Sequence, residues 1–268
     1  MYSRLVVRLQ PAPGQSSLEF LRLAGDPLRW QLLRELARSD RRVQELTGLT
    51  GRPQNLVSYH LGQLRSAGLV SARRSSADGR DAYYRVDLPK FGTLLAETGR
   101  AVHPGLQLTA GVAGGASGPP GVVVARLLFL CTGNSARSQM AEALAVARSQ
   151  GRVAAASAGS HPKPLHANTV RVMRERGIDL GSRRSKRLSL FAARQFDHVI
   201  TLCDKVREVC PEFPGHPGYI HWSVPDPAAI GDDDEATLPV FRQTADDVET
   251  RVTYLLAGLG TLPGRGPS

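Results

Sequence analysis

The chain has 268 residues, enough for two domains that each bury a core of their own. Hydrophobic residues make up 41% of it and charged residues 22%, within the range of soluble globular proteins. No apolar stretch is long enough to span a membrane, and the N-terminal stretch lacks the apolar core of a secretory signal. We therefore expect a cytoplasmic protein without membrane contact.

The positive charge is concentrated in the first part of the chain. The formal net charge is +10; residues 1–105 carry 16 Lys and Arg against 9 Asp and Glu, and residues 106–268 carry 18 against 15. This excess indicates a polyanionic partner for the first part, although an arginine-rich solvated surface would have the same composition. The three cysteines, Cys131, Cys203 and Cys210, argue by their odd number against a secreted disulfide framework and for reactive or metal-binding thiols.

A stretch rich in Gly, Ala, Pro and Ser divides the chain. It runs from Ala101 to Gly121 and contains a Pro-Pro pair near its end, a composition typical of a flexible connector. We therefore expect a first domain over residues 1–102, a linker over 103–122 and a second domain over 123–262.

The first domain is predicted to begin with helices. Apolar residues recur at helical spacing from Leu18 to Leu36, with an interruption before Pro27, where Asp26 is suited to cap a new helix. A short helix is expected near 43–46.

A further helix and a hairpin are predicted to follow. The helix opens at Gly51-Arg52-Pro53 and is closed by Gly68. A strand then begins at Leu69, and the turn signal Asp78-Gly79 leads to a return strand that reaches Val86. This first domain is therefore expected to be mainly α-helical, with a basic hairpin as its wing.

Helix, turn, helix and hairpin form the layout of a winged helix-turn-helix. The stretches NLVSYHLGQLRSAGLVSARR and GRDAYYRV resemble the arsenic-repressor (ArsR-type) family of transcription regulators, over roughly residues 16–100. The resemblance implies a homodimer, formed through this domain, that binds operator DNA with one helix in the major groove. A winged helix used only for dimerisation stays an alternative. The side chains expected to reach bases or phosphates are Arg52, Gln54, Asn55, Ser58, Tyr59 and Arg65 on the helix and Arg73, Arg74 and Arg80 on the hairpin.

The first domain contains no cysteine. Members of the ArsR-type family that sense arsenite or metals commonly do so with thiolates in this domain. His60 and His103 alone are poor ligands for such soft species. We therefore expect no metal site here.

The clearest motif of the second domain is the segment CTGNSARS, Cys131–Ser138. It follows the apolar run Leu127–Leu130, which suits a buried parallel strand, and a helical pattern continues from it to Arg148. Such a strand, loop and helix aim backbone N–H groups and the positive end of the helix at a bound tetrahedral oxyanion. The residues expected to surround that anion are Thr132, Gly133, Asn134, Ser135, Ala136, Arg137 and Ser138.

Three side chains of this segment carry the expected chemistry. The field of the loop favours the thiolate of Cys131, which makes it the expected nucleophile. Arg137, six positions later, can grip two oxygens of the substrate, and Ser138 is placed to donate a hydrogen bond to the sulfur.

The segment CTGNSARSQMAEAL resembles the low-molecular-weight phosphatase fold and, more closely, its arsenate reductase branch. The similarity continues through SAGSHP, ITLCDKVREVCPEFPG and HWSVPDPA and covers nearly all of residues 124–258. It implies an α/β domain with a four-stranded parallel sheet and helices on both faces. The sequence itself indicates strands near 126–131, 152–157 and 197–202, with helices between them.

The arsenate reductase resemblance implies a thiol relay. Cys131 attacks arsenate while Asp226 protonates the departing oxygen, Cys203 then attacks Cys131 and releases arsenite, and Cys210 captures Cys203 in a disulfide. Thioredoxin, or another thiol reductant, is the implied electron donor, and no bound cofactor is required. Two alternatives stay open, a protein-tyrosine phosphatase and a regulator that uses the domain as an arsenic or redox sensor.

The spacing of two cysteines constrains the relay. Cys203 and Cys210 lie seven residues apart, and seven residues of helix rise about 10.5 Å, whereas a disulfide needs Cα atoms within about 7 Å. The segment between them is therefore expected to unwind or loop out on oxidation.

Other charged groups are interpreted less specifically. Glu142, on the helix after the loop, could help to order Asn134. The basic side chains of residues 183–187 are expected to form a solvated face, and the acidic run 232–235 a solvated loop rather than a metal site.

Overall fold

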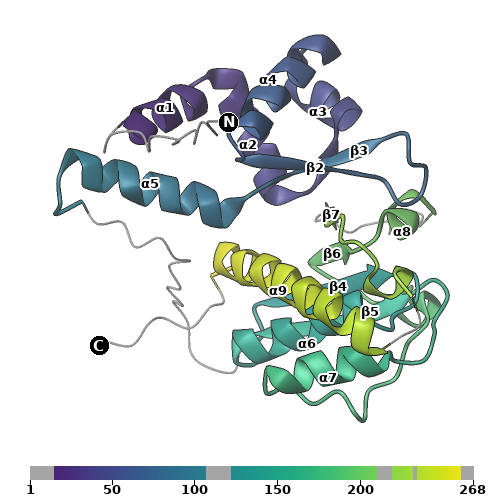
Figure 1. Cartoon of the computed structure of the whole chain (residues 1–268). Helices are drawn as coiled ribbons and strands as arrows, with labels where there is room; N and C mark the ends of the chain where they lie inside the picture. The colour runs from purple at the N-terminus through teal and green to yellow at the C-terminus, as the bar shows by residue number, and fades with distance from the viewer. Residues whose placement is uncertain (1–14, 107–121, 210–218, 232–233, 261–268) are drawn as a thin grey trace, which may run out of the picture. The chain divides into compact units, whose positions relative to one another are not determined.

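The computed structural model describes residues 15–106, 122–209, 219–231 and 234–260 (Figure 1). The chain forms two compact units. Of the described residues, the first unit contains 15–37, 42–72 and 84–106, and the second contains 38–41, 73–83 and those from 122 onward. Residues 107–121 of the expected linker lie outside the described residues. In the part of the chain that is described, no helix is long and apolar enough to cross a membrane.

Helices dominate the first part of the chain. Asp26 caps the second helix as predicted, because its Oδ1 accepts hydrogen bonds from the backbone N–H groups of Leu28 and Arg29 at 3.0 and 2.9 Å. The third helix is longer than predicted and continues to Thr50, since the left-handed residue that ends it is Gly51. The helices are α1 (Gln15–Ala24), α2 (Pro27–Arg38), α3 (Val43–Thr50), α4 (Gln54–Ser66) and α5 (Leu88–Val102), the last of which the sequence analysis did not predict.

A small sheet completes the winged layout. Its three strands lie in the order β1-β3-β2, with β1 at Arg41–Arg42, β2 at Val70–Arg74 and β3 at Ala82–Val86. The predicted turn joins β2 to β3, and Gly79 adopts a φ of 70°, which favours glycine. Strand β1 was not predicted, because two arginines carry no strand pattern.

The second unit contains the predicted four-stranded parallel sheet, in the order β5-β4-β6-β7. The strands are β4 (Ala125–Cys131), β5 (Val153–Gly159), β6 (His198–Thr201) and β7 (Tyr219–His221). The central strand β4 is buried from Leu127 to Cys131, so both faces of the sheet are covered there. Its last residue, Cys131, pairs in register with Gly159 at the end of β5.

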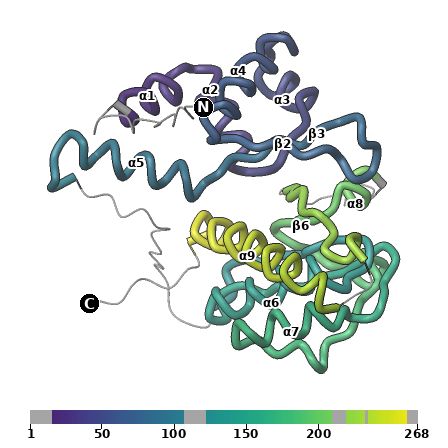
Figure 2. Tube along the Cα trace, viewed as in Figure 1, coloured from purple at the N-terminus to yellow at the C-terminus, as the bar shows by residue number. Residues whose placement is uncertain are grey.

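Helices pack around this sheet. α6 contacts β4 and β5. It also packs against α9, beside which it runs in Figure 2, and α7 packs against α9 as well. The interior includes Phe129, Met140 and Phe241, all fully buried. The helices are α6 (Arg137–Ser149), α7 (Ala167–Glu175), α8 (Asp204–Val209) and α9 (Asp234–Gly258), with short 3-10 helices η1 (Leu188–Phe191) and η2 (Pro227–Ala229).

Candidate active site

The candidate nucleophile lies at the carboxyl end of the central strand. Cys131 is the last residue of β4, and α6 begins six positions later at Arg137. β5 ends beside Cys131 at Gly159, and β6 leads into Cys203 at the same edge of the sheet. Open parallel sheets bind their ligands at this edge, because the loops that follow adjacent strands meet there.

Two groups of the loop direct hydrogen bonds at the sulfur of Cys131. The backbone N–H of Asn134 donates to the Sγ at 3.2 Å, and the hydroxyl of Ser138 lies 3.0 Å from it. Because Asn134 Nδ2 donates to Ser138 Oγ at 2.8 Å, the proton of that hydroxyl is left to point at the sulfur. Both donors stabilise negative charge on the sulfur, as a thiolate nucleophile requires.

Asn134 is the centre of the loop's hydrogen-bond network. It is fully buried and adopts a φ of 47°, a left-handed conformation that asparagine tolerates better than most residues. Its Nδ2 also donates to Ser157 Oγ at 2.8 Å, and its Oδ1 accepts from Gln139 Nε2 at 3.1 Å and from Lys186 N at 2.8 Å. This side chain therefore joins the loop to α6, to β5 and to the segment before η1.

A second ring of charges supports Asn134. Ser157 Oγ donates to Glu142 Oε2 at 2.5 Å, and the same carboxylate pairs with Lys186 at 2.9 Å and with Arg183 at 2.7 Å. Glu142 therefore does reach Asn134, through Ser157. The expectation that the basic segment is merely a solvated face was wrong for Arg183 and Lys186, because both are held against a buried carboxylate.

The carbonyl groups of the loop turn away from the sulfur. Those of Thr132, Gly133 and Ser135 accept hydrogen bonds from the backbone N–H groups of 161, 163 and 166 at 2.9, 2.9 and 3.1 Å. In a trans peptide the N–H points opposite to the C=O, so the N–H groups of residues 133, 134 and 136 face the inner side of the loop. Inward N–H groups in this arrangement are suited to bind an oxyanion, as the motif predicts.

Close packing of β5 holds this loop in place. A Cβ added at Gly159 would lie 2.6 Å from the carbonyl oxygen of Thr132 and 2.9 Å from the N of Asn134. Only glycine fits there. Gly159, Ser157 and Gln139 were not among the predicted site residues; the SAGSHP similarity was the only signal that pointed toward the first two.

The arginine of the loop faces the predicted general acid. Arg137 Nη2 lies 2.8 Å from Asp226 Oδ2, and its Nη1 donates to the carbonyl oxygen of Val224 at 2.9 Å. Arg137 is only 5% exposed, whereas the side chain of Asp226 is 47% exposed at the N-terminus of η2. A buried guanidinium with an accessible carboxylate beside it can bind an oxyanion and deliver a proton to it.

The second thiol lies against the loop. Cys203 is buried, and its Sγ lies 3.3 Å from Thr132 Oγ1. Burial raises the pKa of Cys203, and the nearby Cys131 raises it further, while the charge of Arg137 opposes the rise. The third thiol, Cys210, lies outside the described residues.

The residues proposed to contact DNA fall into two groups. Those at and near α4 are all exposed: Arg52, Gln54, Asn55, Ser58, Tyr59 and Arg65. Arg74 and Arg80 on the hairpin are exposed as well, but Arg73 is partly buried and forms an ion pair with Asp204 at 2.6 Å. Among the described residues, no group of His, Cys, Asp and Glu is arranged to hold a metal ion.

Comparisons with known proteins agree with this geometry. Residues 126–262, just over half of the chain, match the family model of low molecular weight phosphotyrosine protein phosphatases, and residues 26–72 match that of the bacterial regulatory proteins of the arsR family. An arsenate reductase of Halalkalibacterium halodurans is 36% identical over 126 residues, which cover 47% of this chain and 91% of that protein. The arsenate reductase of Bacillus subtilis is 35% identical with the same coverage.

Solved structures with similarity to the chain include an arsenate reductase in the phosphate binding state. It is 32% identical in sequence, and the match covers 50% of this chain and 98% of that protein's chain, with a TM-score of 0.45. The chain belongs to the low molecular weight phosphotyrosine protein phosphatase family through its C-terminal, arsenate reductase-like domain, which is fused to an N-terminal helix-turn-helix of the arsR family.

Proposed function

We propose that the chain reduces arsenate to arsenite through a relay of Cys131, Cys203 and Cys210. The observation that carries this proposal is the position of Cys203, whose sulfur lies 3.3 Å from the side chain that follows the nucleophile. A phosphatase needs the loop and an acid but no second thiol. A reductase must transfer two electrons to the substrate, and a second thiol at the loop supplies them.

The first step is an attack on arsenic. The thiolate of Cys131 forms an S–As bond, and Asp226 donates a proton to the oxygen that leaves as water. The inward N–H groups of the loop and the guanidinium of Arg137 stabilise the negative charge on the remaining oxygens. Arsenic remains As(V) until the next step.

The second step transfers the electrons. The sulfur of Cys203 loses its proton and attacks that of Cys131, an S–S bond forms, and the electron pair of the S–As bond goes to arsenic, which leaves as arsenite with the proton on one of its oxygens. Before the first step the charge near Cys131 helps to raise the pKa of Cys203 and keeps it protonated. Once Cys131 is bonded to arsenic, its sulfur no longer carries a charge, which removes that contribution and makes Cys203 a better nucleophile at the stage where it is needed.

The third step regenerates the nucleophile. The thiolate of Cys210 attacks Cys203, forms the Cys203–Cys210 disulfide and releases Cys131 as thiolate. A dithiol reductant such as thioredoxin then supplies two electrons and two protons. This role of Cys210 rests on the sequence and on the similarity to arsenate reductases.

Arsenate-dependent NADPH oxidation, coupled through thioredoxin and thioredoxin reductase, tests the relay. Wild type is expected to turn over, and Cys210→Ser and Cys203→Ser are expected to lose multiple turnover. Hydrolysis of an aryl phosphate by the same variants is the control, because it needs only Cys131, Arg137 and Asp226. Unchanged arsenate turnover in both variants would contradict the relay.

A phosphatase is the second candidate, favoured by the Arg137–Asp226 pair, which suits phosphate ester hydrolysis equally well. Aryl phosphate turnover that survives both cysteine substitutions, together with no arsenate turnover by wild type, would support it over the reductase.

We further propose that the arsR-type region binds operator DNA as a homodimer. The exposed side chains of α4 and the positive charge of residues 1–105 support this function. Fluorescence anisotropy of a labelled duplex tests it. Affinity is expected to fall steeply with salt, and Arg52→Ala should weaken binding by about 10-fold, the loss typical of one contact. If Arg52→Ala binds the duplex as tightly as wild type does, the assignment of the α4 side chains to the DNA contact is contradicted.

A further inference from the structure

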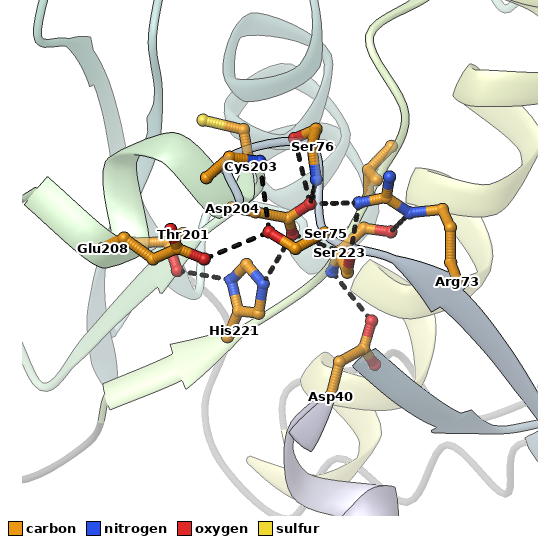
Figure 3. A network of polar contacts seen from close by, with 12 residues as sticks. Asp40, Arg73, Ser75, Ser76, Thr201, Cys203, Asp204, Glu208, His221 and Ser223 are labelled. Atoms are coloured by element: carbon orange, nitrogen blue, oxygen red, sulfur yellow. Dashed lines mark hydrogen bonds and ion pairs between the residues drawn. The ribbon is translucent and has the colours of Figure 1, made fainter. Parts of the chain in front are cut away.

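The helix between the two relay cysteines holds the tip of the β2–β3 hairpin. Asp204, the residue after Cys203, is the first residue of α8 and has a fully buried side chain (Figure 3). Its Oδ2 accepts hydrogen bonds from Arg73 Nη2 at 2.6 Å, from Ser76 N at 2.7 Å and from Ser76 Oγ at 2.9 Å. One carboxylate therefore binds a side chain and the backbone of the hairpin.

Asp204 is held firmly from its other side. Its Oδ1 lies 3.1 Å from His221 Nε2 and accepts from Ser223 Oγ at 2.7 Å. Burial alone would raise the pKa of Asp204, but hydrogen bonds from His221, Ser76 and Ser223 and the charge of Arg73 outweigh it and hold that pKa far below its ordinary value. The carboxylate is thus ionised and fully hydrogen-bonded when the hairpin is docked.

A second contact lies one helical turn further along. Glu208 Oε1 accepts a hydrogen bond from the buried Ser75 hydroxyl at 3.1 Å (Figure 3). Asp204 and Glu208 are four residues apart and so lie on the same face of α8. Both carboxylates therefore face the hairpin only while α8 is helical. Arg73 has a further partner outside α8, because its Nε donates to the carbonyl oxygen of Ser223 at 3.1 Å.

The proposed disulfide is incompatible with that helix. α8 occupies 204–209, directly between Cys203 and Cys210. Seven helical residues rise about 10.5 Å, and a disulfide requires its Cα atoms within about 7 Å. Formation of the disulfide must unwind α8 and separate Asp204 from Glu208.

We propose that Asp204 and Glu208 couple the oxidation state of the relay to the DNA-binding hairpin. In the reduced chain they hold residues 73–76 and neutralise Arg73. When two thiols lose two electrons and two protons, to arsenate through Cys131 or to a thiol oxidant, α8 unwinds and releases the hairpin. Without a carboxylate partner, Arg73 keeps only uncharged partners, Ser223 among them, and its charge is available to DNA phosphates. This inference depends on the proposed function in one respect, the formation of the Cys203–Cys210 disulfide.

Hydrogen exchange of the full-length protein tests the coupling. The reduced protein is compared with protein oxidised by diamide, which takes up the two electrons and two protons as the corresponding hydrazine. Exchange within residues 73–83 is expected to quicken at least about 5-fold on oxidation, the lower range of allosteric coupling. Peptides of β4 are expected to keep their protection and so report that the fold is intact.

Matched variants separate the coupling from general damage. Cys210→Ser cannot form the Cys203–Cys210 bond and is expected to show no change in 73–83 with diamide. Glu208→Ala, which removes the acceptor of the Ser75 hydroxyl, is expected to quicken exchange of 73–83 in the reduced state, as is Asp204→Asn. A labelled duplex of arbitrary sequence is expected to bind oxidised wild type at least about 5-fold more tightly than reduced, a difference that Arg73→Gln removes.

The outcomes distinguish this proposal from the proposed function. If mass spectrometry shows the Cys203–Cys210 disulfide and arsenate is turned over, but exchange of 73–83 is unchanged, the coupling is overturned and the reductase stands. If neither the disulfide nor turnover is observed, both are overturned. Faster exchange on oxidation without a change in DNA affinity overturns the role of Arg73 as the group released to DNA.

Discussion

Asn134 Nδ2 donates a hydrogen bond to Ser138 Oγ at 2.8 Å, and this contact sets the direction in which the serine hydroxyl faces the sulfur of Cys131. The nucleophile is therefore controlled by a residue three positions away that does not react. Substitutions behind the loop are expected to impair catalysis even when no reacting group is changed.

Asn134→Ala should lower kcat for arsenate by about 10-fold to about 100-fold, in the range of lost positioning hydrogen bonds. It leaves the buried hydroxyls of Ser138 and Ser157 without a donor, so the free energy of unfolding should also fall, by about 1–3 kcal/mol. Steady-state kinetics and urea unfolding measure the two effects. Ser157→Ala, one contact further from the sulfur, should have a smaller effect on kcat; an equal effect would contradict this order.

Gly159→Ala should displace the loop, because its Cβ would meet the Thr132 carbonyl at 2.6 Å. We expect arsenate turnover and phosphate binding to be largely lost. Gly48→Ala is the matched control: a Cβ there meets nothing within 4 Å, on an exposed face of α3. It should leave turnover unchanged and raise the free energy of unfolding by about 0.5–1 kcal/mol. Full activity of Gly159→Ala would show that the loop tolerates a shift.

Arg137→Lys should reduce kcat/KM by about 100-fold or more, although the charge is kept. A lysine cannot reach the Val224 carbonyl, the Asp226 carboxylate and an oxyanion with one planar fork, as the guanidinium can. Kinetics with arsenate and with an aryl phosphate should show the same loss, because both use the loop. A loss confined to arsenate would assign Arg137 to the electron-transfer steps instead.

Asp204 should make stability depend on pH in the acid range. Its pKa in the folded chain lies far below the ordinary 3.8, which the unfolded chain regains. The stability that it contributes is therefore fully present above about pH 5 and is lost as the pH falls below 3.8 toward the folded value. The difference in unfolding free energy between wild type and Asp204→Asn, from urea denaturation, should shrink with acidity.

Asp246→Asn is the control for this pH dependence, because the Asp246 side chain is 70% exposed and its ion pair with Arg176 lies at the surface. Its difference from wild type should stay small throughout the pH range. A gap between wild type and Asp204→Asn that is constant with pH would show that Asp204 is not held as the charged form.

Much of the site was predictable because its residues are contiguous. The Cys131–Ser138 segment carries the candidate nucleophile, the inward N–H groups and the arginine in one strand–loop–helix, and local rules describe each part. The caps and turns at Asp26, Gly68 and Gly79 were predictable for the same reason, since a backbone conformation constrains the residue that adopts it.

Residues that support the loop could not be predicted in this way. Ser157 and Lys186 reach Asn134 across separations of 23 and 52 residues, which only the pairing of β4 with β5 and the return of the chain before η1 bring together. Ser157 reaches Asn134 with its hydroxyl and Lys186 with its backbone N–H, and both residues look like ordinary surface residues in the sequence. The basic segment was misinterpreted because its partner, Glu142, is distant in the chain.

The sequence by itself predicted the parallel sheet and a loop suited to an oxyanion, with Cys131 as the candidate nucleophile, because these depend on short-range patterns of polarity, spacing and backbone preference. The tertiary structure alone decided which groups orient Cys131, where Cys203 lies and which carboxylate holds Arg73. These depend on contacts between residues up to 131 positions apart, such as Arg73 with Asp204. No local pattern encodes such a contact, because its energy exists only after the chain has folded.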